Sequence, residues 1–281
     1  MAAIELSRIE VPAGPIDYQD TGGDGPALVF THGFPMNHLQ WRKVIPLLDD
    51  QFRCIAPTLP MGAHRSPMKP GTDLTHRGQV AILADFLDAL DVDDVTLVMN
   101  DWGGAQFIVS ENLDRRVGRL VFVACEAFDN FPPPQARPAE LLCRVPGGAR
   151  LLMQLLRTSF FRHNRRAWGA VSRTRIPDDV LDTWFDPARL DPAIRRDLRA
   201  FATGTPPAKT LLEWSESLRG FTKPALVVWA NQDAMMPQDH GRRLAALLPD
   251  ARLIEIEDSG TLIPEDQPAH LAAALRTFLH S

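Results

Sequence analysis

The stretch VMNDWGG, residues 98–104, places an acidic residue, Asp101, where an apolar run ends and a helical pattern begins. Gly103 and Gly104 follow, where the backbone has to turn tightly. A strand–turn–helix elbow of this kind lifts one side chain above a sheet and directs a helix N-terminus at it. Because that end of a helix favours negative charge, we expect Asp101 to stay ionised. It would attack an sp³ carbon and leave a covalent ester.

The turn HGFP, residues 32–35, follows an earlier apolar run and offers backbone N–H groups to the same place. We expect the N–H groups of Phe34 and of Trp102, the residue after Asp101, to form a small anion hole. A tight turn would explain HGFP alone. The two motifs in this order favour a reactive site.

Short β-rich runs alternate with longer helical patterns, which indicates an α/β fold with a mostly parallel central sheet flanked by helices. The predicted strands cover residues 27–33, 52–58, 94–100, 119–125, 223–230 and 252–258. Residues 4–22 are predicted to form an antiparallel hairpin at the sheet edge. The predicted helices cover residues 38–49, 74–91, 103–115, 239–248 and 267–279.

The composition changes at FPPPQARP, residues 131–138, and no convincing strand follows before about residue 219. Helical pieces there are interrupted by proline and glycine, which predicts a helical insertion between two strands of the sheet. The basic run RHNRR, residues 162–166, is interpreted as a solvated helix surface rather than a phosphate site.

The overall composition is that of an ordinary soluble protein. The chain has 281 residues, of which 45% are hydrophobic and 23% charged, with a net charge of −5. This charge argues against general nucleic-acid binding, and no apolar stretch approaches the roughly 20 residues of a membrane span. Three scattered cysteines show neither metal-ligand nor disulfide spacing, so a cytoplasmic location is expected. Nothing indicates a metal or an organic cofactor, and the oligomeric state stays open.

Four segments together resemble the α/β-hydrolase fold superfamily: HGFP, NDWGG, WANQD (229–233) and GTLIPEDQP (260–268). They are most similar to its Asp-nucleophile branch, the haloalkane dehalogenases and epoxide hydrolases. The resemblance implies a core of residues 1–130 and 220–281 and an inserted helical cap at 131–219.

By position, Asp101 resembles the nucleophile of that branch, and Phe34 and Trp102 resemble its anion hole. In the dehalogenases the Trp after the nucleophile donates its indole N–H to the leaving halide, a role that the resemblance implies for Trp102. Two acids could orient a catalytic base. Asp233 matches one dehalogenase arrangement and Glu126 another, and the DxxxP spacing that follows Asp233 favours it.

The resemblance fails at Thr261, which stands where family members have the His that activates water. A hydroxyl with no base nearby cannot deprotonate water at neutral pH. His64 and His240 are the candidates to replace it, and His32 is expected to be structural. The remaining histidines are expected at solvated helix positions: His38, His76, His163, His270 and His280.

A second departure concerns epoxide opening, for which that branch uses cap tyrosines as acids. Tyr18, in the N-terminal hairpin, is the only tyrosine of the sequence, so epoxide hydrolysis is disfavoured. Three hypotheses remain. The first is a haloalkane dehalogenase-like enzyme acting on a small apolar substrate. The second is a non-hydrolytic lyase, isomerase or cyclase of secondary metabolism, and the third is a catalytically impaired ligand-binding protein.

Overall fold

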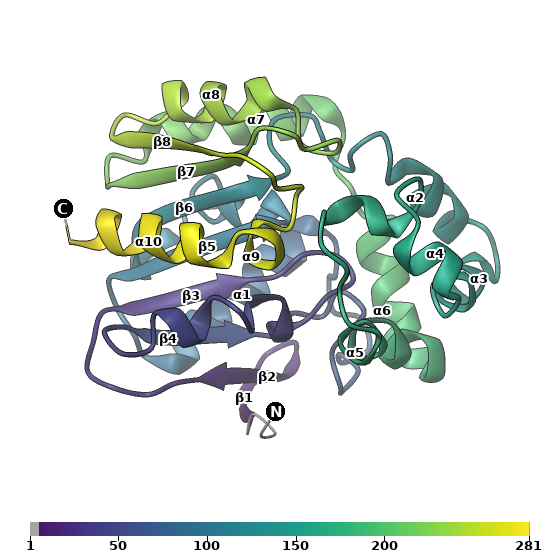
Figure 1. Cartoon of the computed structure of the whole chain (residues 1–281). Coiled ribbons are helices and arrows are strands. Elements are labelled where there is room, and N and C mark those ends of the chain that lie inside the picture. The colour runs from purple at the N-terminus through teal and green to yellow at the C-terminus, as the bar shows by residue number, and fades with distance from the viewer. Residues whose placement is uncertain (1–5, 281) are drawn as a thin grey trace.

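The computed structural model describes residues 6–280 and is built on one eight-stranded sheet (Figure 1). The strand order is β1-β2-β4-β3-β5-β6-β7-β8. β1 and β2 form an antiparallel hairpin that pairs antiparallel with β4, and all other neighbours are parallel. The bounds are β1 Ser7–Val11, β2 Gly14–Asp20, β3 Ala27–Thr31, β4 Arg53–Pro57, β5 Val95–Asp101, β6 Val117–Cys125, β7 Ala225–Ala230 and β8 Ala251–Ile256. The predicted fold class and edge hairpin are therefore confirmed, with residues 4 and 5 of the predicted hairpin outside the described residues.

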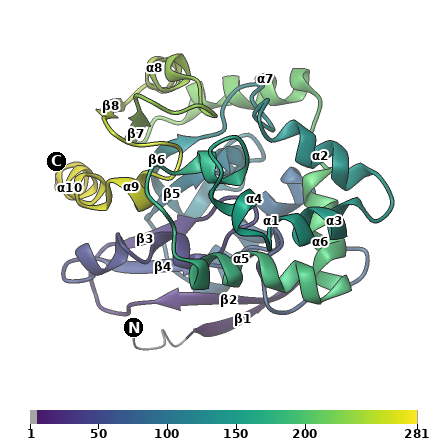
Figure 2. The same ribbon diagram turned by 45° about the vertical axis from the view of Figure 1, so that its right-hand side comes forward.

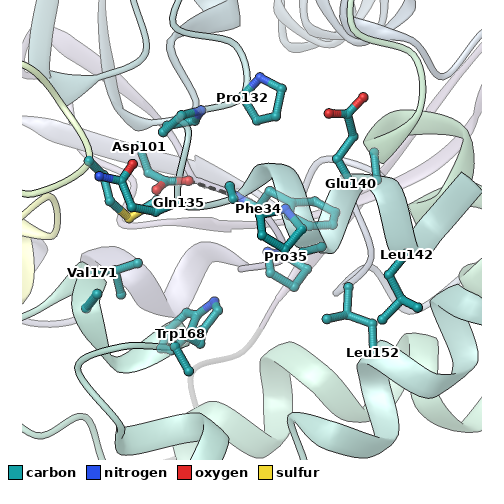
Figure 3. Close-up of a pocket in the computed structure, with 18 of the residues that line it drawn as sticks. Phe34, Pro35, Asp101, Pro132, Gln135, Glu140, Leu142, Leu152, Trp168 and Val171 are labelled. Carbon is teal, nitrogen blue, oxygen red and sulfur yellow. Dashed lines mark hydrogen bonds between the residues drawn. The ribbon is translucent and has the colours of Figure 1, made fainter.

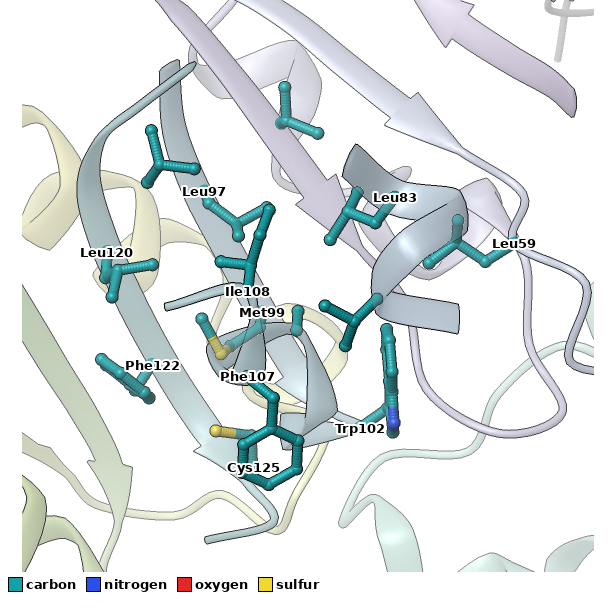
Figure 4. Packing of buried hydrophobic residues seen from close by; sticks show 14 of the residues in the cluster. Leu59, Leu83, Leu97, Met99, Trp102, Phe107, Ile108, Leu120, Phe122 and Cys125 are labelled. Atoms are coloured by element: carbon teal, nitrogen blue, oxygen red, sulfur yellow. The ribbon is translucent and has the colours of Figure 1, made fainter. Parts of the chain in front are cut away.

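Helices pack on both faces of this sheet (Figure 2). On one face, α1 (His76–Leu90) and α8 (Gln238–Leu247) contribute Leu83, Leu87 and Leu244 to the largest apolar cluster, part of which Figure 4 shows. On the other face, α10 (Pro268–Leu279) contributes Leu271 and Leu275. Because both faces are covered, β3, β5 and β7 are buried at every residue, as their continuous apolar character predicts.

The sequence of α1 explains both where the helix begins and which side faces the sheet. Thr75 is the N-cap, and its side-chain oxygen accepts a hydrogen bond from the backbone N–H of Gly78. Val80, Leu83 and Leu87 recur at helical spacing and are fully buried, as expected. His76, the first residue of the helix, lies on the same stripe.

The regular elements between β6 and β7 are all helical (Figure 1). They are α2 Arg137–Arg144, α3 Gly148–Leu155, α4 Ser159–His163, η5 Trp168–Val171, α5 Asp178–Leu190, α6 Pro192–Ala202, α7 Ala208–Ser217 and η6 Leu218–Gly220. Most of them share an apolar cluster of their own around Trp184 and Phe185. α7 differs, since Trp214 packs against Phe107 of the core with ring centroids 4.5 Å apart.

Two predicted helices are wrong in type. Residues 38–49 form two short 3-10 turns, η1 His38–Trp41 and η2 Ile45–Leu47, and Pro46 lacks the N–H that a longer helix needs. Residues 103–115 form the 3-10 helix η3 Gly103–Ile108 and the turn η4 Asp114–Arg116. Here the Gln106 side chain donates to the Gly103 carbonyl at 2.7 Å and takes an acceptor that an α-helix would use.

The C-terminal motif GTLIPEDQP forms the short helix α9 Ile263–Asp266 just before α10. No helix within residues 6–280 has both the length and the apolar character needed to cross a bilayer.

Candidate active site

Asp101 is the last residue of β5 and has a positive φ of 64°, a conformation that side-chain-bearing residues rarely adopt. Its carboxylate oxygen Oδ1 accepts a hydrogen bond from the backbone N–H of Phe34 at 3.0 Å (Figure 3). The side chain lines a cavity of about 370 Å³. Strained backbone of this kind concentrates at functional sites, and here it aims one carboxylate into the cavity.

Two glycines make the close approach to this carboxylate possible. A Cβ at Gly33 would lie 2.0 Å from the Asp101 Oδ1 atom, and a Cβ at Gly103 would lie 1.7 Å from the Glu126 carbonyl oxygen. Both distances are impossible contacts, so the HGFP turn and the elbow depend on glycine at these two positions.

The ionisation of Asp101 differs from the sequence-based expectation. Burial raises the pKa of Asp101 from 3.8 to about 7, and the negative charge of Asp233 adds to this, whereas the Phe34 N–H acts in the opposite direction. The expectation of a permanently ionised Asp101 is therefore wrong. A single N–H donor does not offset the loss of water around the carboxylate.

A chain of amide hydrogen bonds holds three loops of the site together. The Gly33 N–H donates to Gln40 Oε1 at 2.8 Å, and Gln40 Nε2 donates to Asn100 Oδ1 at 2.6 Å. Asn100 Nδ2 in turn donates to the Thr261 carbonyl at 2.7 Å. All these side chains are buried, which makes such bonds costly to break. The HGFP turn, the elbow and the 261 loop are thus fixed relative to one another.

Thr261 is fully buried, and its hydroxyl donates to Asp233 Oδ1 at 2.9 Å. The second carboxylate oxygen of Asp233, Oδ2, is buried without a hydrogen-bond partner among the described residues. Burial raises the pKa of Asp233 to about 6. Asp233 therefore contacts the side chain at position 261, as an acid that orients a base there would, while the side chain present is a hydroxyl.

Glu126, the other candidate acid, follows β6 and lines the same cavity as Asp101. Burial raises its pKa well above the usual range, and the charge of Asp101 adds to this. Its backbone N–H donates to the Asp101 carbonyl at 2.9 Å, which fixes the two residues side by side. The cavity floor therefore holds two carboxyl groups whose pKa values are both raised.

The indole N–H of Trp102 donates to Nδ1 of His76 at 3.1 Å. In this arrangement it is engaged with a neighbouring ring rather than free to face a leaving halide. Burial lowers the pKa of His76 to about 3, so the ring is neutral and its hydrogen is on Nε2, 3.5 Å from the Thr205 hydroxyl. Among residues 6–280, the Phe34 N–H is the one hydrogen-bond donor to the Asp101 carboxylate, and the Trp102 backbone N–H does not donate to it.

The histidines are distributed differently from the expectation. His76 and His38 are buried, so their placement on solvated helix positions is wrong. His76 also lines the cavity, and its position on the buried stripe of α1 is the signal that would have found it. His270 and His280 are exposed as expected, and His163 is partly buried.

Neither proposed substitute base lines the cavity. His64 is buried against Asp197, with Nε2 3.1 Å from a carboxylate oxygen, and His240 packs on Phe128. His32 is buried and accepts from the Leu59 N–H at 2.8 Å, which agrees with a structural role. The site therefore gains no base from His64 or His240.

The rest of the cavity wall is mainly apolar, and much of it comes from the helical segment between β6 and β7 (Figure 3). Leu142, Leu152, Leu156, Phe161 and Trp168 are among its lining residues. Tyr18 lies instead on β2 and packs against Phe86, with ring centroids 5.4 Å apart, so it does not reach this wall. Within residues 6–280 no cluster of three or more His, Cys, Asp or Glu side chains is arranged to hold a metal ion.

The raised pKa of Asp101 predicts a stability effect. Between about pH 4 and pH 7 the folded chain holds a proton that the unfolded chain has lost, so the stability falls as the pH rises through this window. Asp101→Asn should remove this loss and stabilise the fold at pH 8, by at most about 4 kcal/mol at roughly 1.4 kcal/mol per pKa unit. Thermal melts at pH 4 and pH 8 measure it. An equal stabilisation at both pH values would instead mean that asparagine stabilises the positive-φ backbone at position 101, whatever the charge.

Comparisons with known proteins agree with this fold. Residues 26–268 match the model of the alpha/beta hydrolase fold family. The chain is 29% identical to a haloalkane dehalogenase of Mesorhizobium japonicum, over 99% of this chain and 92% of that protein. It is also 29% identical to a cis-3-alkyl-4-alkyloxetan-2-one decarboxylase of Xanthomonas campestris, over 97% and 95% of the two chains. The haloalkane dehalogenase DbeA from Bradyrhizobium elkani has the same fold, with a TM-score of 0.79 at 20% identity over 99% and 98% of the chains.

Proposed function

Because the chain belongs to the α/β-hydrolase fold family, we propose that it is a haloalkane dehalogenase-like enzyme whose Asp101 attacks an electrophilic carbon of a small apolar substrate. The observation that carries the proposal is the placement of Asp101. Its carboxylate is lifted into an apolar cavity by a strained elbow, with Oδ1 held at 3.0 Å by the Phe34 N–H. A carboxylate in such a cleft, largely free of water, is a strong nucleophile towards carbon.

The proposed step is a displacement. One oxygen of the Asp101 carboxylate forms a bond to the sp³ carbon, the carbon–halogen bond breaks, and the halide leaves with the bonding electrons. The product is an ester of Asp101. The leaving halide would be bound by the indole N–H of Trp102, which in this structure donates to Nδ1 of His76 and would exchange that acceptor for the halide.

Hydrolysis of that ester is the step for which the site has no suitable catalytic group. It needs a base to take a proton from water, and position 261 provides a hydroxyl bonded to Asp233. The neutral His76, with a pKa of about 3, is too weak a base to serve. We therefore propose that the ester accumulates after one displacement.

Intact-protein mass spectrometry after incubation with a primary bromoalkane tests this proposal. The expected result is one alkyl adduct per chain, which peptide mapping places on Asp101. An unmodified protein after long incubation with a series of bromoalkanes and epoxides would contradict the proposed attack. It would also favour the hypothesis that the chain is a ligand-binding protein.

The rate of adduct formation should depend on pH with a single rising step. Attack requires the carboxylate form, and the pKa of Asp101 is about 7. The ionised fraction, and with it the rate, should therefore rise about tenfold between pH 6 and pH 8 and then level off. Rates measured by quenched mass spectrometry across this range check it. A rate that is flat down to pH 5 would mean that the carboxylate stays ionised in the cavity.

A second candidate is a reaction that needs no water, as in the lyase, isomerase or cyclase hypothesis. Two observations favour it: the missing base, and the 29% identity to the oxetanone decarboxylase over nearly the whole chain. A carboxyl group with a pKa of about 7 also suits a general acid or base at neutral pH. Incubation with a dialkyl-substituted four-membered lactone separates the two candidates. Carbon dioxide release without an adduct would favour the second.

A further inference from the structure

Charge is divided unevenly between the helical insertion and the rest of the chain. Residues 131–219 hold 15 Lys and Arg against 9 Asp and Glu, whereas the rest of the chain holds 15 against 26. Within residues 141–177 there are eight arginines and no acidic residue. This cationic segment includes α3, α4 and η5, and it supplies much of the cavity wall. Part of the cavity wall thus comes from a strongly basic segment of an acidic protein.

Arg166 stands out among these arginines because of where it lies. It is exposed, and it is the only Lys or Arg among the described residues that line the cavity. Several neighbouring arginines are neutralised: Arg162 by Asp182 at 2.5 Å, and Arg175 by Asp178 at 3.2 Å. No salt bridge within residues 6–280 involves Arg166. Its guanidinium is therefore available to a ligand in the cavity.

The positions of the other charged groups in the cavity favour binding of an anion beside Arg166 rather than beside Asp101. At the floor the ionised form of Asp101 would repel a second negative charge, and Glu126 beside it is a carboxyl group that offers an anion no cationic partner. Glu140 also lines the wall, but Arg144 neutralises it at 2.5 Å. Gln135 and Thr205 also line the cavity, but most of the other lining side chains are leucine, phenylalanine, proline or alanine, which offer no polar partner. An extended ligand would thus have an apolar middle and two different ends.

We propose that the cavity binds an amphiphile whose carboxylate pairs with Arg166 at the rim, while its apolar chain carries the electrophilic carbon to Asp101. This inference names the substrate class for the proposed function and rests on it. Arg suits the task because its planar guanidinium can hold both carboxylate oxygens at once.

Equilibrium binding of octanoate and of its neutral analogue octanamide, followed by calorimetry at low salt and neutral pH, tests the inference without any covalent step. The wild-type protein should bind octanoate more tightly. Arg166→Gln should lower the octanoate affinity roughly threefold to tenfold, as expected for a rim-exposed ion pair, and leave octanamide unchanged. Arg166→Glu should reverse the preference.

Arg150→Gln is the matched control, because Arg150 is an exposed arginine of α3 that does not line the cavity. It removes the same charge from the same cationic segment and should leave the preference for octanoate intact. Equal binding of the two ligands to the wild-type protein would overturn the inference. An equal loss of octanoate affinity in Arg166→Gln and Arg150→Gln would also overturn it, since the overall positive charge of the segment would then explain the preference.

Covalent labelling with ω-bromooctanoate and with its methyl ester separates this inference from the proposed function. We expect faster labelling by the carboxylate in the wild-type protein, and a loss of this preference in Arg166→Gln. A carboxylate preference in binding without any adduct would support Arg166 and contradict attack by Asp101. Adducts that form equally fast from both reagents would support Asp101 and overturn the role of Arg166.

Discussion

Thr261→His is expected to convert a protein that stops after one displacement into one that releases halide continuously. An imidazole at position 261 would replace the hydroxyl that now lies 2.9 Å from Asp233, and Asp233 Oδ2 is buried and unpaired. Asp233 could then orient the ring while the ring takes a proton from water. General-base catalysis contributes about 10²–10⁴-fold, so steady-state halide release should rise at least about 100-fold above that of the wild-type protein.

The matched controls are Thr261→Val, which removes the hydroxyl and adds no base, and the double variant Thr261→His with Asp233→Asn. Neither should turn over appreciably, because the first has no imidazole and the second leaves it unoriented. Position 261 is fully buried, so circular dichroism melts must first show that the histidine variant is folded. A folded Thr261→His protein that still stops after one event would mean that residue 261 does not face the ester.

Replacing Asp101 with asparagine should abolish adduct formation altogether, since an amide does not displace halide from an sp³ carbon. The fold should survive, because the stability argument above predicts an equal or higher melting temperature for this variant. Glu126→Gln is the informative comparison. It alters the other carboxyl group of the cavity floor and should keep the adduct on Asp101. Labelling that moves to Glu126 or persists in Asp101→Asn would identify a different nucleophile.

The sequence allows the fold and the elbow to be predicted because both depend on local patterns. Near-continuous apolar runs predict buried parallel strands, and the two glycines after Asp101 predict the tight turn. HGFP likewise predicts a backbone donor at Phe34, which is found at 3.0 Å from the carboxylate. These features are encoded within a few residues of each motif.

The electrostatic state of the site could not be predicted in the same way. Burial raises the pKa of Asp101, and the insertion residues that line the cavity around it, Pro132 to Thr205, are 31 to 104 positions away in the sequence. The chain of amide hydrogen bonds runs from Gln40 through Asn100 to Thr261, and Asn100 and Thr261 are 161 positions apart. No local sequence pattern predicts these bonds.

The roles of His76 and Arg166 could be predicted from the sequence only in part. Both belong to patterns that the sequence displays, the buried stripe of α1 and the basic run RHNRR. The helical pattern predicts which face of α1 is buried, and the basic run predicts a positive charge. Only the folded structure shows that His76 and Arg166 line the same cavity as Asp101. Helical spacing fixes the direction of a side chain but not what lies opposite it.

The most direct test of the account is to count the halide released per protein chain when the wild-type enzyme meets an excess of bromoalkane. We expect release to stop at one bromide per chain, in step with the mass of one alkyl group on Asp101. Release of many equivalents would contradict the account, because it would require a water-activating base that the site around Thr261 does not contain.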